Sequence, residues 1–239
     1  FFGSGAETLQ ASQIAKYDLV VDALGLDSPS RILEIGCGWG GFAEVAANRG
    51  HHVTGLTISR EQLEFARGRL GDRAEIRFQD YRDTKEQYDA IASIEMIEAV
   101  GEANWPTYFK VLHDRLKPGG SAAVQAITID RALYDGYRRK ADFIQRYIFP
   151  GGMLPSPSVL RDQIKRAGLG IERSIEFGHS YSVTLRRWHD TFNEKWDQVS
   201  AMGFDDRFRR MWNFYLTSCA ATFESSNCDV TQITVRRPS

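Results

Sequence analysis

A short apolar run ends abruptly in glycines at residues 31–42, which read RILEIGCGWGGF. Four of the six residues at 36–41 are glycine. Glycine lets the backbone bend tightly and lets a ligand approach it closely. In an open α/β sheet, ligands bind in the crevice beyond the carboxyl ends of parallel strands. The segment therefore predicts a first strand, a tight turn and a helix, with a nucleotide-type ligand at the turn.

The spacing of these glycines separates the turn from a dinucleotide-binding loop. It is GxGxGG instead of GxGxxG, and the next predicted strand carries no acidic residue at its end. A tight strand-to-helix turn that binds no ligand would also use glycine here. Whether the turn binds a ligand therefore depends on the segments further along the chain.

Short β-rich runs alternate with amphipathic helical windows along most of the chain. This alternation is typical of βα units around a mostly parallel sheet. In LKPGG, at residues 116–120, proline stops a helix and glycine favours a turn into the next strand. We expect strands at 31–35, 52–57, 75–78, 88–94, 121–127, 171–177 and 230–236, and helices near 9–25, 40–49, 60–70, 104–116, 157–167, 184–201 and 205–225.

Residues 130–156 interrupt the alternation. The segment reads DRALYDGYRRKADFIQRYIFPGGMLPS, is rich in aromatic residues and lies between two predicted strands. We expect it to form a lid or substrate lobe inserted into a single domain that covers residues 1–239. The chain starts without Met and in the middle of a pattern, so we expect its N-terminus to be incomplete.

Charge and composition argue against several classes of protein. A net charge of −1 gives no preference for a polyanion, so we expect no nucleic-acid partner. Cys37, Cys219 and Cys228 show no pairing or zinc-type spacing, which suits a reducing cytosol and predicts no metal site. The sequence has no signal peptide and no apolar stretch long enough to span a bilayer. We therefore expect a soluble, cytoplasmic protein.

Eight segments carry a family resemblance over nearly the whole chain. In chain order they read LEIGCGWGG, VTGLTISREQLEFA, QDYRD, SIEMIEAVG, LKPGG, YIFPGGMLPS, FGHSYSVTLRRW and FYLTSCAATF. The first half resembles class I S-adenosylmethionine-dependent methyltransferases, and the full set resembles the cyclopropane-fatty-acid synthase family among them. The resemblance implies an α/β fold with a Rossmann-like sheet, helices on both faces and an inserted lid or acyl-binding lobe. It also implies S-adenosylmethionine as the cofactor.

The resemblance places part of the cofactor site on the first strand and the turn after it. Glu34 ends that strand, where a carboxylate can orient the glycine loop or accept a hydrogen bond from the methionine ammonium group. Gly36 and Gly38 offer their backbone to the cofactor. These three residues are the expected cofactor contacts on the first strand and its turn.

The remaining cofactor contacts follow the next two strands. Many methyltransferases hold the ribose with an acidic residue, whereas the resemblance gives this place to Thr57 and Gln62. It matches Asp80 and Tyr81 to the adenine contact, with the carboxylate accepting from the exocyclic amine. Thr57 and Gln62 could also be helix-entry residues, and Asp80 could be a loop cap.

The resemblance also implies a bound bicarbonate ion that accepts a proton. Glu98, Tyr181 and the backbone of Ile127 match the family residues that hold this ion. Gln125 stands where many bacterial members have His; it can donate a hydrogen bond but cannot shuttle a proton. A Cys of the family site, or its substitute, should fall upstream of Phe1. Glu98 could instead cap the helix that follows it.

The inserted segment supplies candidate substrate contacts. An alkene is a poor nucleophile, so its attack on a sulfonium methyl group needs close alignment in a dry site and leaves a carbocation. Aromatic faces stabilise a developing cation. Tyr137, Phe143, Tyr147 and Phe149 could line such a tunnel, although each could equally well pack the lobe.

The predicted reaction is transfer of a methyl carbon from S-adenosylmethionine to the double bond of an unsaturated phospholipid acyl chain, with ring closure to a cyclopropane. The alternative is an acyl C-methyltransferase that makes a methyl-branched or methylene product, or a homologue that binds lipid and cofactor without catalysis. A small-molecule or amine methyltransferase is disfavoured because the Asn/Asp-Pro-Pro-Tyr signature of amino methylation is missing.

The expected partner is a membrane lipid. A phospholipid substrate implies peripheral contact of a cytoplasmic enzyme with a membrane surface, and a homodimer is compatible with the sequence. Arg207, Arg209 and Arg210 could contact an anionic surface, but such a run more often forms a solvated helix face.

Overall fold

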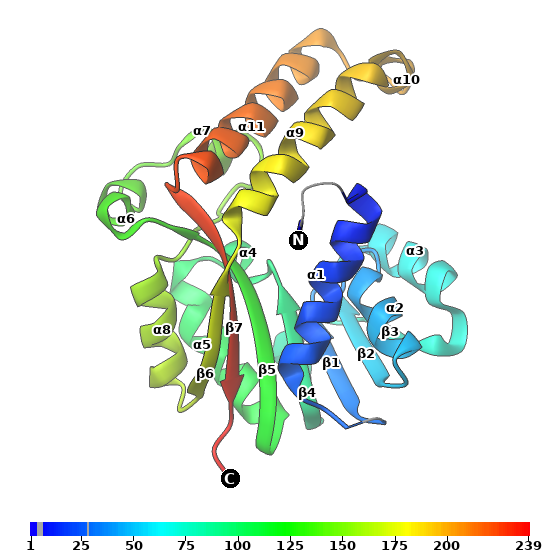
Figure 1. The fold of residues 1–239 in the computed structure, drawn as a ribbon, viewed down its shortest axis with the longest axis vertical. Helices are drawn as coiled ribbons and strands as arrows, with labels where there is room; N and C mark the ends of the chain where they lie inside the picture. Colours follow the sequence, from blue (N-terminus) through cyan, green and yellow to red (C-terminus); the bar gives the residue numbers. More distant parts are fainter. Residues whose placement is uncertain (4–6, 28) are drawn as a thin grey trace.

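The structure, a computed structural model, describes residues 1–3, 7–27 and 29–239. Its centre is a seven-stranded sheet in the order β3-β2-β1-β4-β5-β7-β6 (Figure 1). The pairs β1–β2, β1–β4, β2–β3 and β4–β5 are parallel, whereas β7 runs antiparallel to both β5 and β6. The strands are β1 (Arg31–Ile35), β2 (His52–Thr57), β3 (Glu75–Phe78), β4 (Tyr88–Ile94), β5 (Leu116–Ile129), β6 (Gly170–Glu176) and β7 (Cys228–Arg236).

Helices cover both faces of this sheet because successive strand residues point to opposite faces. Ile32 joins a core cluster with the helices on one face, and its neighbour Leu33 joins the cluster on the other. The first face carries α1 (Leu9–Leu24), α2 (Gly41–Asn48) and α3 (Arg60–Leu70), and the second carries α5 (Trp105–Arg115) and α8 (Pro157–Arg166). The predicted Rossmann-like methyltransferase fold is confirmed.

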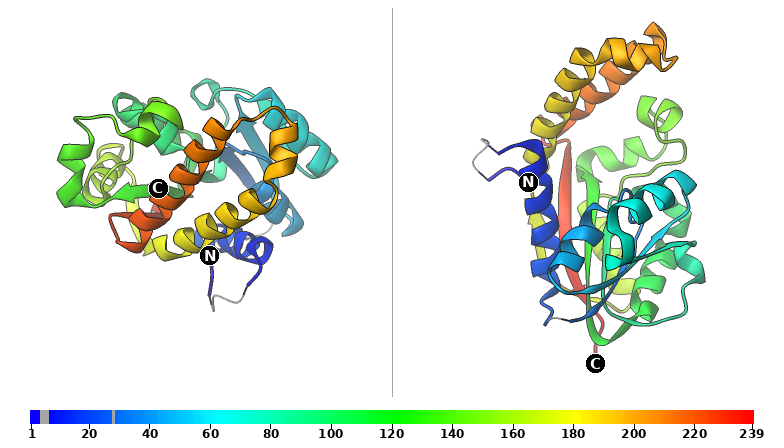
Figure 2. Two further views of the ribbon diagram at one scale, coloured as in Figure 1. Left: turned by 90° about the horizontal axis from the view of Figure 1, so that it is seen from above. Right: turned by 90° about the vertical axis from the view of Figure 1, so that its right-hand side faces the viewer.

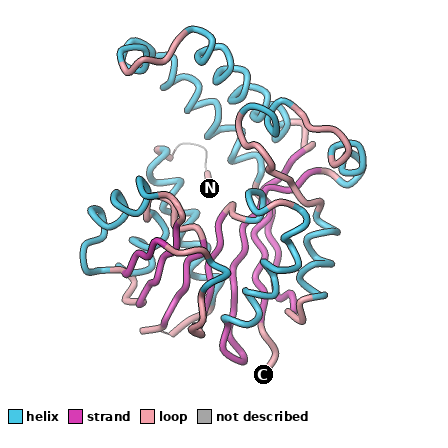
Figure 3. The backbone as a smooth tube through the Cα atoms, turned by 180° about the vertical axis from the view of Figure 1, so that it is seen from behind, coloured by secondary structure: helices cyan, strands magenta, loops and turns pink. Residues whose placement is uncertain are grey.

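A second group of helices stands above the edge of the sheet at which the parallel strands end (Figures 1 and 2). Seen from behind, the same helices rise above one continuous sheet (Figure 3). They are α9 (Gly178–Glu194), α10 (Trp196–Ala201) and α11 (Asp206–Glu224), together with α6 (Arg131–Tyr137) and α7 (Phe143–Tyr147) of the inserted segment. Shorter helical turns are α4 (Ile97–Val100) and the 3-10 helices Gly71–Arg73, Tyr81–Asp83 and Glu102–Asn104. In the described part of the chain, no helix is both long and apolar enough to cross a membrane.

The helix predicted at 184–201 was wrong at its start and in its continuity. α9 begins six residues earlier, at Gly178, and ends before Lys195, after which α10 starts. A carboxylate from a distant strand explains the earlier start. Asp229 of β7 accepts hydrogen bonds from the backbone N–H groups of Gly178 and Val230, each at 2.7 Å, and so satisfies the start of α9.

The segment 116–120 also differs from its prediction. The helix stops before it, at Arg115, as expected. Leu116 already pairs with Tyr88, and regular pairing then resumes between Ala90 and Ser121. The residues between bulge out of the sheet, because Gly119 donates a hydrogen bond to Arg237 instead of to β4. The predicted turn is thus an irregularity within β5.

Candidate active site

The glycine turn follows β1 at the edge where the parallel strands end. The N–H groups of Gly36 and Cys37 both donate to the Leu56 carbonyl of β2, at 3.1 and 2.8 Å, which holds the turn against the next strand. Gly38 has φ +52°, and a Cβ placed on it would meet no protein atom within 4 Å. The conformation therefore favours glycine, while the space beside it is free for a ligand.

Glu34 is the next-to-last residue of β1, and its side chain is buried. Burial raises the pKa of its carboxyl group well above the usual value, and a hydrogen bond from the Ala43 backbone only partly offsets this. The oxygen Oε2 is buried without a hydrogen-bond partner among the described residues. A buried, unsatisfied acceptor beside the glycine turn fits a donor or cation that the protein itself does not supply.

Thr57 and Gln62 are brought together just beyond β2. The Thr57 hydroxyl donates to Gln62 Oε1 at 2.9 Å and accepts from the Ser59 N–H at 3.1 Å. Ser59 is the N-cap of α3, and its hydroxyl accepts from the Gln62 N–H at 3.2 Å. The helix-entry role considered for these residues is therefore present in the structure, and their predicted contact with a ribose stays a prediction.

Asp80 and Tyr81 lie beyond the end of β3. Asp80 caps the 3-10 helix Tyr81–Asp83 through the N–H of Arg82, at 2.9 Å, and also forms an ion pair with the Arg82 side chain at 2.7 Å. Tyr81 is buried, with its ring against Tyr108 at a centroid distance of 5.9 Å. The capping alternative for Asp80 is thus realised, and the adenine contact remains untested.

Three side chains meet beyond the end of β4. The amide nitrogen of Gln125, on β5, donates to Glu95 Oε1 and to the Tyr181 hydroxyl, both at 2.8 Å. The Tyr181 hydroxyl in turn donates to the same Glu95 oxygen. Burial and the nearby charge of Glu95 raise the pKa of Tyr181 well above its usual value, so its hydroxyl stays a donor. Gln125 and Tyr181, which lie far apart in the chain, are brought together as predicted.

Glu98 and Ile127 meet in the same region. The backbone N–H of Ile127 donates to Glu98 Oε1 at 2.5 Å, while Glu98 Oε2 is buried without a partner among the described residues. Burial, and then the charge of Glu95, raise the pKa of Glu98 to about 8. A carboxyl group with such a pKa can take up or release a proton near neutral pH, as a general acid or base must.

Glu95 is the residue that the sequence interpretation missed. It follows β4 directly and adopts φ +55°, which is uncommon for a residue with a side chain. Its N–H donates to the Gln125 carbonyl at 2.8 Å, so both its backbone and its side chain are fixed to β5. The available signal was its place in SIEMIEAVG, because a polar residue at the carboxyl end of a central strand lies where α/β sheets bind ligands.

Lys16 of α1 brings a buried amine toward these acidic groups. Its side-chain nitrogen lies 4.8 Å from the ring centre of Tyr17 and 6.0 Å from that of Tyr181. Burial lowers the pKa of Lys16, and the charge of Glu95 opposes that shift. The acidic residues of the cluster therefore share their low-dielectric surroundings with a basic group.

The inserted segment packs against α11 and reaches Glu98. The ring of Phe143 lies 4.7 Å from that of Phe214, and Phe149 lies 6.0 Å from Tyr215, measured between centroids. The N–H of Met153 donates to the Glu98 carbonyl at 2.9 Å. The segment thus joins the helices above the sheet to the acidic cluster.

The four predicted substrate residues have different environments. Tyr137 is half-buried, and its hydroxyl accepts from the Leu154 N–H at 3.2 Å. Phe143 is also half-buried and contacts Tyr147 at 5.4 Å between ring centroids. Tyr147 and Phe149 are more than half exposed, at 58% and 56%. The lobe-packing alternative therefore holds for Tyr137 and Phe143, whereas two aromatic rings remain accessible.

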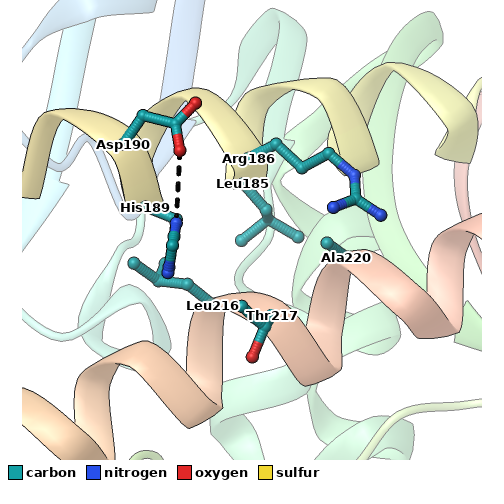
Figure 4. Close-up of a pocket in the computed structure, with 7 residues that line it drawn as sticks. All are labelled: Leu185, Arg186, His189, Asp190, Leu216, Thr217 and Ala220. Carbon is teal, nitrogen blue, oxygen red and sulfur yellow. Dashed lines mark hydrogen bonds and ion pairs between the residues drawn. The ribbon is translucent and has the colours of Figure 1, made fainter. Parts of the chain in front are cut away.

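A hollow on the α9–α11 pair lies outside this cluster. It is lined by Leu185, Arg186, His189, Asp190, Leu216, Thr217 and Ala220, and Figure 4 shows the contact between His189 and Asp190 within it. That contact measures 3.3 Å between Nδ1 and Oδ1. None of the predicted site residues lines the hollow. It has no part in the candidate active site.

Comparisons with known proteins agree on one family. The family described as mycolic acid cyclopropane synthetase matches residues 1–233. The tuberculostearic acid methyltransferase UfaA1 of Mycobacterium tuberculosis is 42% identical over 235 residues, which are 96% of this chain and 55% of that protein. The cyclopropane-fatty-acyl-phospholipid synthase of Escherichia coli is 36% identical over 239 residues, 97% of this chain and 60% of that protein. The chain thus spans little more than half the length of these relatives.

A solved structure shows the same architecture. The mycolic acid cyclopropane synthase CmaA1 complexed with SAH and CTAB superposes with a TM-score of 0.93 at 27% sequence identity, over 99% of this chain and 88% of that one. The similarity includes the sheet, the inserted segment and the helices above the sheet edge.

Proposed function

Because this chain belongs to the mycolic acid cyclopropane synthetase family, we propose that it transfers a methyl carbon from S-adenosylmethionine to the double bond of an unsaturated phospholipid acyl chain. One observation carries the proposal. Glu98, Ile127, Gln125 and Tyr181 come from three separate elements, α4, β5 and α9, and assemble at the sheet edge that also holds the glycine turn. A polar cluster beside a nucleotide-type turn suits a transfer reaction that ends with the loss of a proton.

The residues around the glycine turn fit S-adenosylmethionine. The unpartnered oxygen of Glu34 suits the ammonium group of its methionine moiety, and the open space at Gly38 suits close backbone approach. Thr57 and Gln62 would hold the ribose from the end of β2. When bound, S-adenosylmethionine supplies an electrophilic methyl group; the protein's own residues align the acceptor and remove the proton.

Gly38→Val should weaken cofactor binding by about tenfold or more, because the added side chain fills the open space beside the turn. Gly25→Val is a matched control. Gly25 also has positive φ, +60°, and open space around it, but it caps α1 at the opposite end of β1. Both variants carry similar backbone strain. Calorimetry should show weaker binding for Gly38→Val alone; equal affinities in two folded variants would place the cofactor elsewhere.

The acceptor requires alignment and the exclusion of water, because an alkene attacks a sulfonium methyl group only at close range. We assign this task to residues 130–156 and α11, which pack together through Phe143–Phe214 and Phe149–Tyr215. The link from Met153 to Glu98 fixes one end of the segment at the acidic cluster. In this account the segment covers the acyl chain and keeps its double bond near the polar cluster.

Bicarbonate does not fit the cluster as it stands. The donors that would hold the anion are the Ile127 N–H, the Gln125 amide and the Tyr181 hydroxyl. The first already donates to Glu98, and the other two donate to Glu95. A further anion would displace one of these carboxyl groups or lie against them without donors. No step of the proposed reaction uses bicarbonate.

The product follows from which proton the carbocation loses. Loss from the transferred carbon with ring closure gives the cyclopropane predicted from the sequence. A methyl-branched or methylene product is the second candidate, and the 42% identity to a tuberculostearic acid methyltransferase favours it. Mass spectrometry of lipids from cells that express the full-length protein should show acyl chains heavier by one CH2 unit. Hydrogenation then distinguishes a ring from a new double bond, and unchanged acyl chains would contradict the proposal.

The outer end of the α9–α11 pair suits contact with a membrane. Met202 and Phe204, in the turn between α10 and α11, are 76% and 41% exposed, and Arg207 is exposed beside them. Arg209 instead bonds to Asn193 at 3.2 Å and lies over the Trp196 ring at 5.0 Å, so it is structural. The exposed Asp205 and Asp206 balance the exposed Arg207 and Arg210, so we infer that the apolar side chains carry the contact with a bilayer surface.

Met202→Ser should reduce co-sedimentation with vesicles that contain anionic phospholipid, because it removes the most exposed of the large apolar side chains in the described part of the chain. Ile14→Ser is the control, since Ile14 is 44% exposed on α1, away from this turn. An equal loss in both variants would show that the turn is not the membrane contact.

A further inference from the structure

We propose that Glu95 is the resident proton acceptor of this site and takes the place of an external anion. The inference rests on the proposed methyl transfer and names a catalytic group for it. In this site, a bound anion and the protein's own carboxyl groups would compete for the same hydrogen-bond donors. The hydrogen-bond donors that a bound anion would need are already directed at carboxyl groups of the protein.

Glu95 accepts hydrogen bonds from the side chains that would otherwise hold a bound anion. A single oxygen, Oε1, accepts from the Gln125 amide at 2.8 Å and from the Tyr181 hydroxyl. No described residue donates to Oε2, so this oxygen is free to take a proton. The backbone hydrogen bond to Gln125 fixes the residue in its unusual conformation. Strained residues of this kind persist where surrounding contacts over-determine them, often at active sites.

The charges around Glu95 also suit an acceptor. Glu98, with its pKa raised to about 8, is mostly neutral near neutral pH, so it places little negative charge beside Glu95. The other titratable groups that Glu95 influences are three tyrosines and one lysine: Tyr17, Tyr181, Tyr215 and Lys16. The pKa values of the tyrosines are raised, so they stay neutral, and Glu95 raises the pKa of Lys16 against the effect of burial. Glu95 thus lies among neutral hydroxyl groups and beside one basic group.

The proton balance is complete without another reactant. Attack of the double bond on the methyl group forms a new C–C bond, breaks the bond from that methyl to sulfur and leaves a cation on the acyl chain. A C–H proton of this cation passes to Glu95 Oε2. The electron pair of that C–H bond then closes the ring or forms a new double bond. Glu95 becomes a neutral carboxylic acid, and Glu98, which can exchange a proton near neutral pH, relays that proton to water.

The test compares methyl transfer in bicarbonate-depleted buffer and in buffer with added bicarbonate. Wild-type turnover should be the same in both. Glu95→Gly should lose about 100-fold or more in depleted buffer and recover part of this loss when bicarbonate or formate is added. Glycine suits φ +55°, so this variant should fold. Glu95→Gln keeps the size of the side chain and should lose activity without rescue.

Glu64→Gln, at an exposed position of α3, is the control and should behave as wild type. Wild-type turnover that falls on depletion and returns with bicarbonate would overturn the inference, as would a fully active Glu95→Gln variant. If wild type transfers no methyl group in either buffer, the proposed function itself fails, and the inference fails with it. Circular dichroism of each variant shows whether a loss of activity comes from unfolding.

Discussion

Glu98→Gln should lower turnover by roughly 30- to 1000-fold, or about 2–4 kcal/mol, while the affinity for S-adenosylmethionine stays unchanged. The carboxyl group of Glu98 has a pKa of about 8 and can exchange a proton near neutral pH. Glutamine keeps the size of the side chain and a carbonyl acceptor for the Ile127 N–H, but it cannot take up or release a proton. Glu98 follows β4, whereas the glycine turn follows β1.

The measurement is steady-state and single-turnover methyl transfer beside calorimetric cofactor binding, with Glu64→Gln as the control. A loss of turnover at constant affinity is the signature of an interaction made mainly in the transition state. Wild-type turnover in Glu98→Gln would show that the proton leaves by a route that does not involve Glu98.

The second large effect is on stability at alkaline pH. The pKa of Glu98 rises from 4.5 to about 8 on folding, so the folded protein holds a proton that the unfolded chain releases. Below pH 4.5 the raised pKa of Glu98 does not change the free energy of unfolding. As the pH rises from 4.5 toward 8, it lowers this free energy progressively, and above pH 8 the loss stays constant. Glu98→Gln removes this cost. The variant should therefore be more stable than wild type by on the order of a few kcal/mol at about pH 9, and nearly equal at about pH 5.

Urea unfolding of both proteins across this pH range gives the difference directly. Only the difference between the two proteins is diagnostic, because Glu34 also has a raised pKa and the paired surface carboxylates have lowered ones. A difference that does not grow with pH would mean that Glu98 is ionised at neutral pH in the folded protein. It would also remove the physical basis for its role in proton exchange.

The strands and helices of the sheet could be predicted because their signals are local. β1 to β4 have the predicted bounds, since each is a short β-rich run that is followed within two residues by a glycine or a polar residue. The start of α9 could not be predicted. It depends on Asp229, which follows Gly178 by 51 residues and reaches it only when β7 lies beside β6. Long-range caps leave no trace in the neighbouring sequence.

The residues of the candidate site also divide into those that local motifs identify and one that only the folded structure identifies. Glu98, Gln125, Ile127 and Tyr181 could be named because their motifs resemble those of a family, and the structure brings them together in two hydrogen-bonded groups. Glu95 could not be assigned a role, because its importance lies in a positive φ and in partners 30 and 86 residues away. Its motif shows only a Glu near the end of a strand.

The most direct test of the proposed function is methyl transfer by the purified full-length protein, with S-adenosylmethionine that carries a deuterated methyl group and vesicles of an unsaturated phospholipid. Mass spectrometry should find the label in the acyl chain, at the carbons of the former double bond. A product that has lost one deuterium arose by proton loss from the transferred carbon, as in a cyclopropane or a methylene group. A product that keeps all its deuterium is a methyl-branched alkene. Label in the headgroup, or no label in the lipid, would contradict the account.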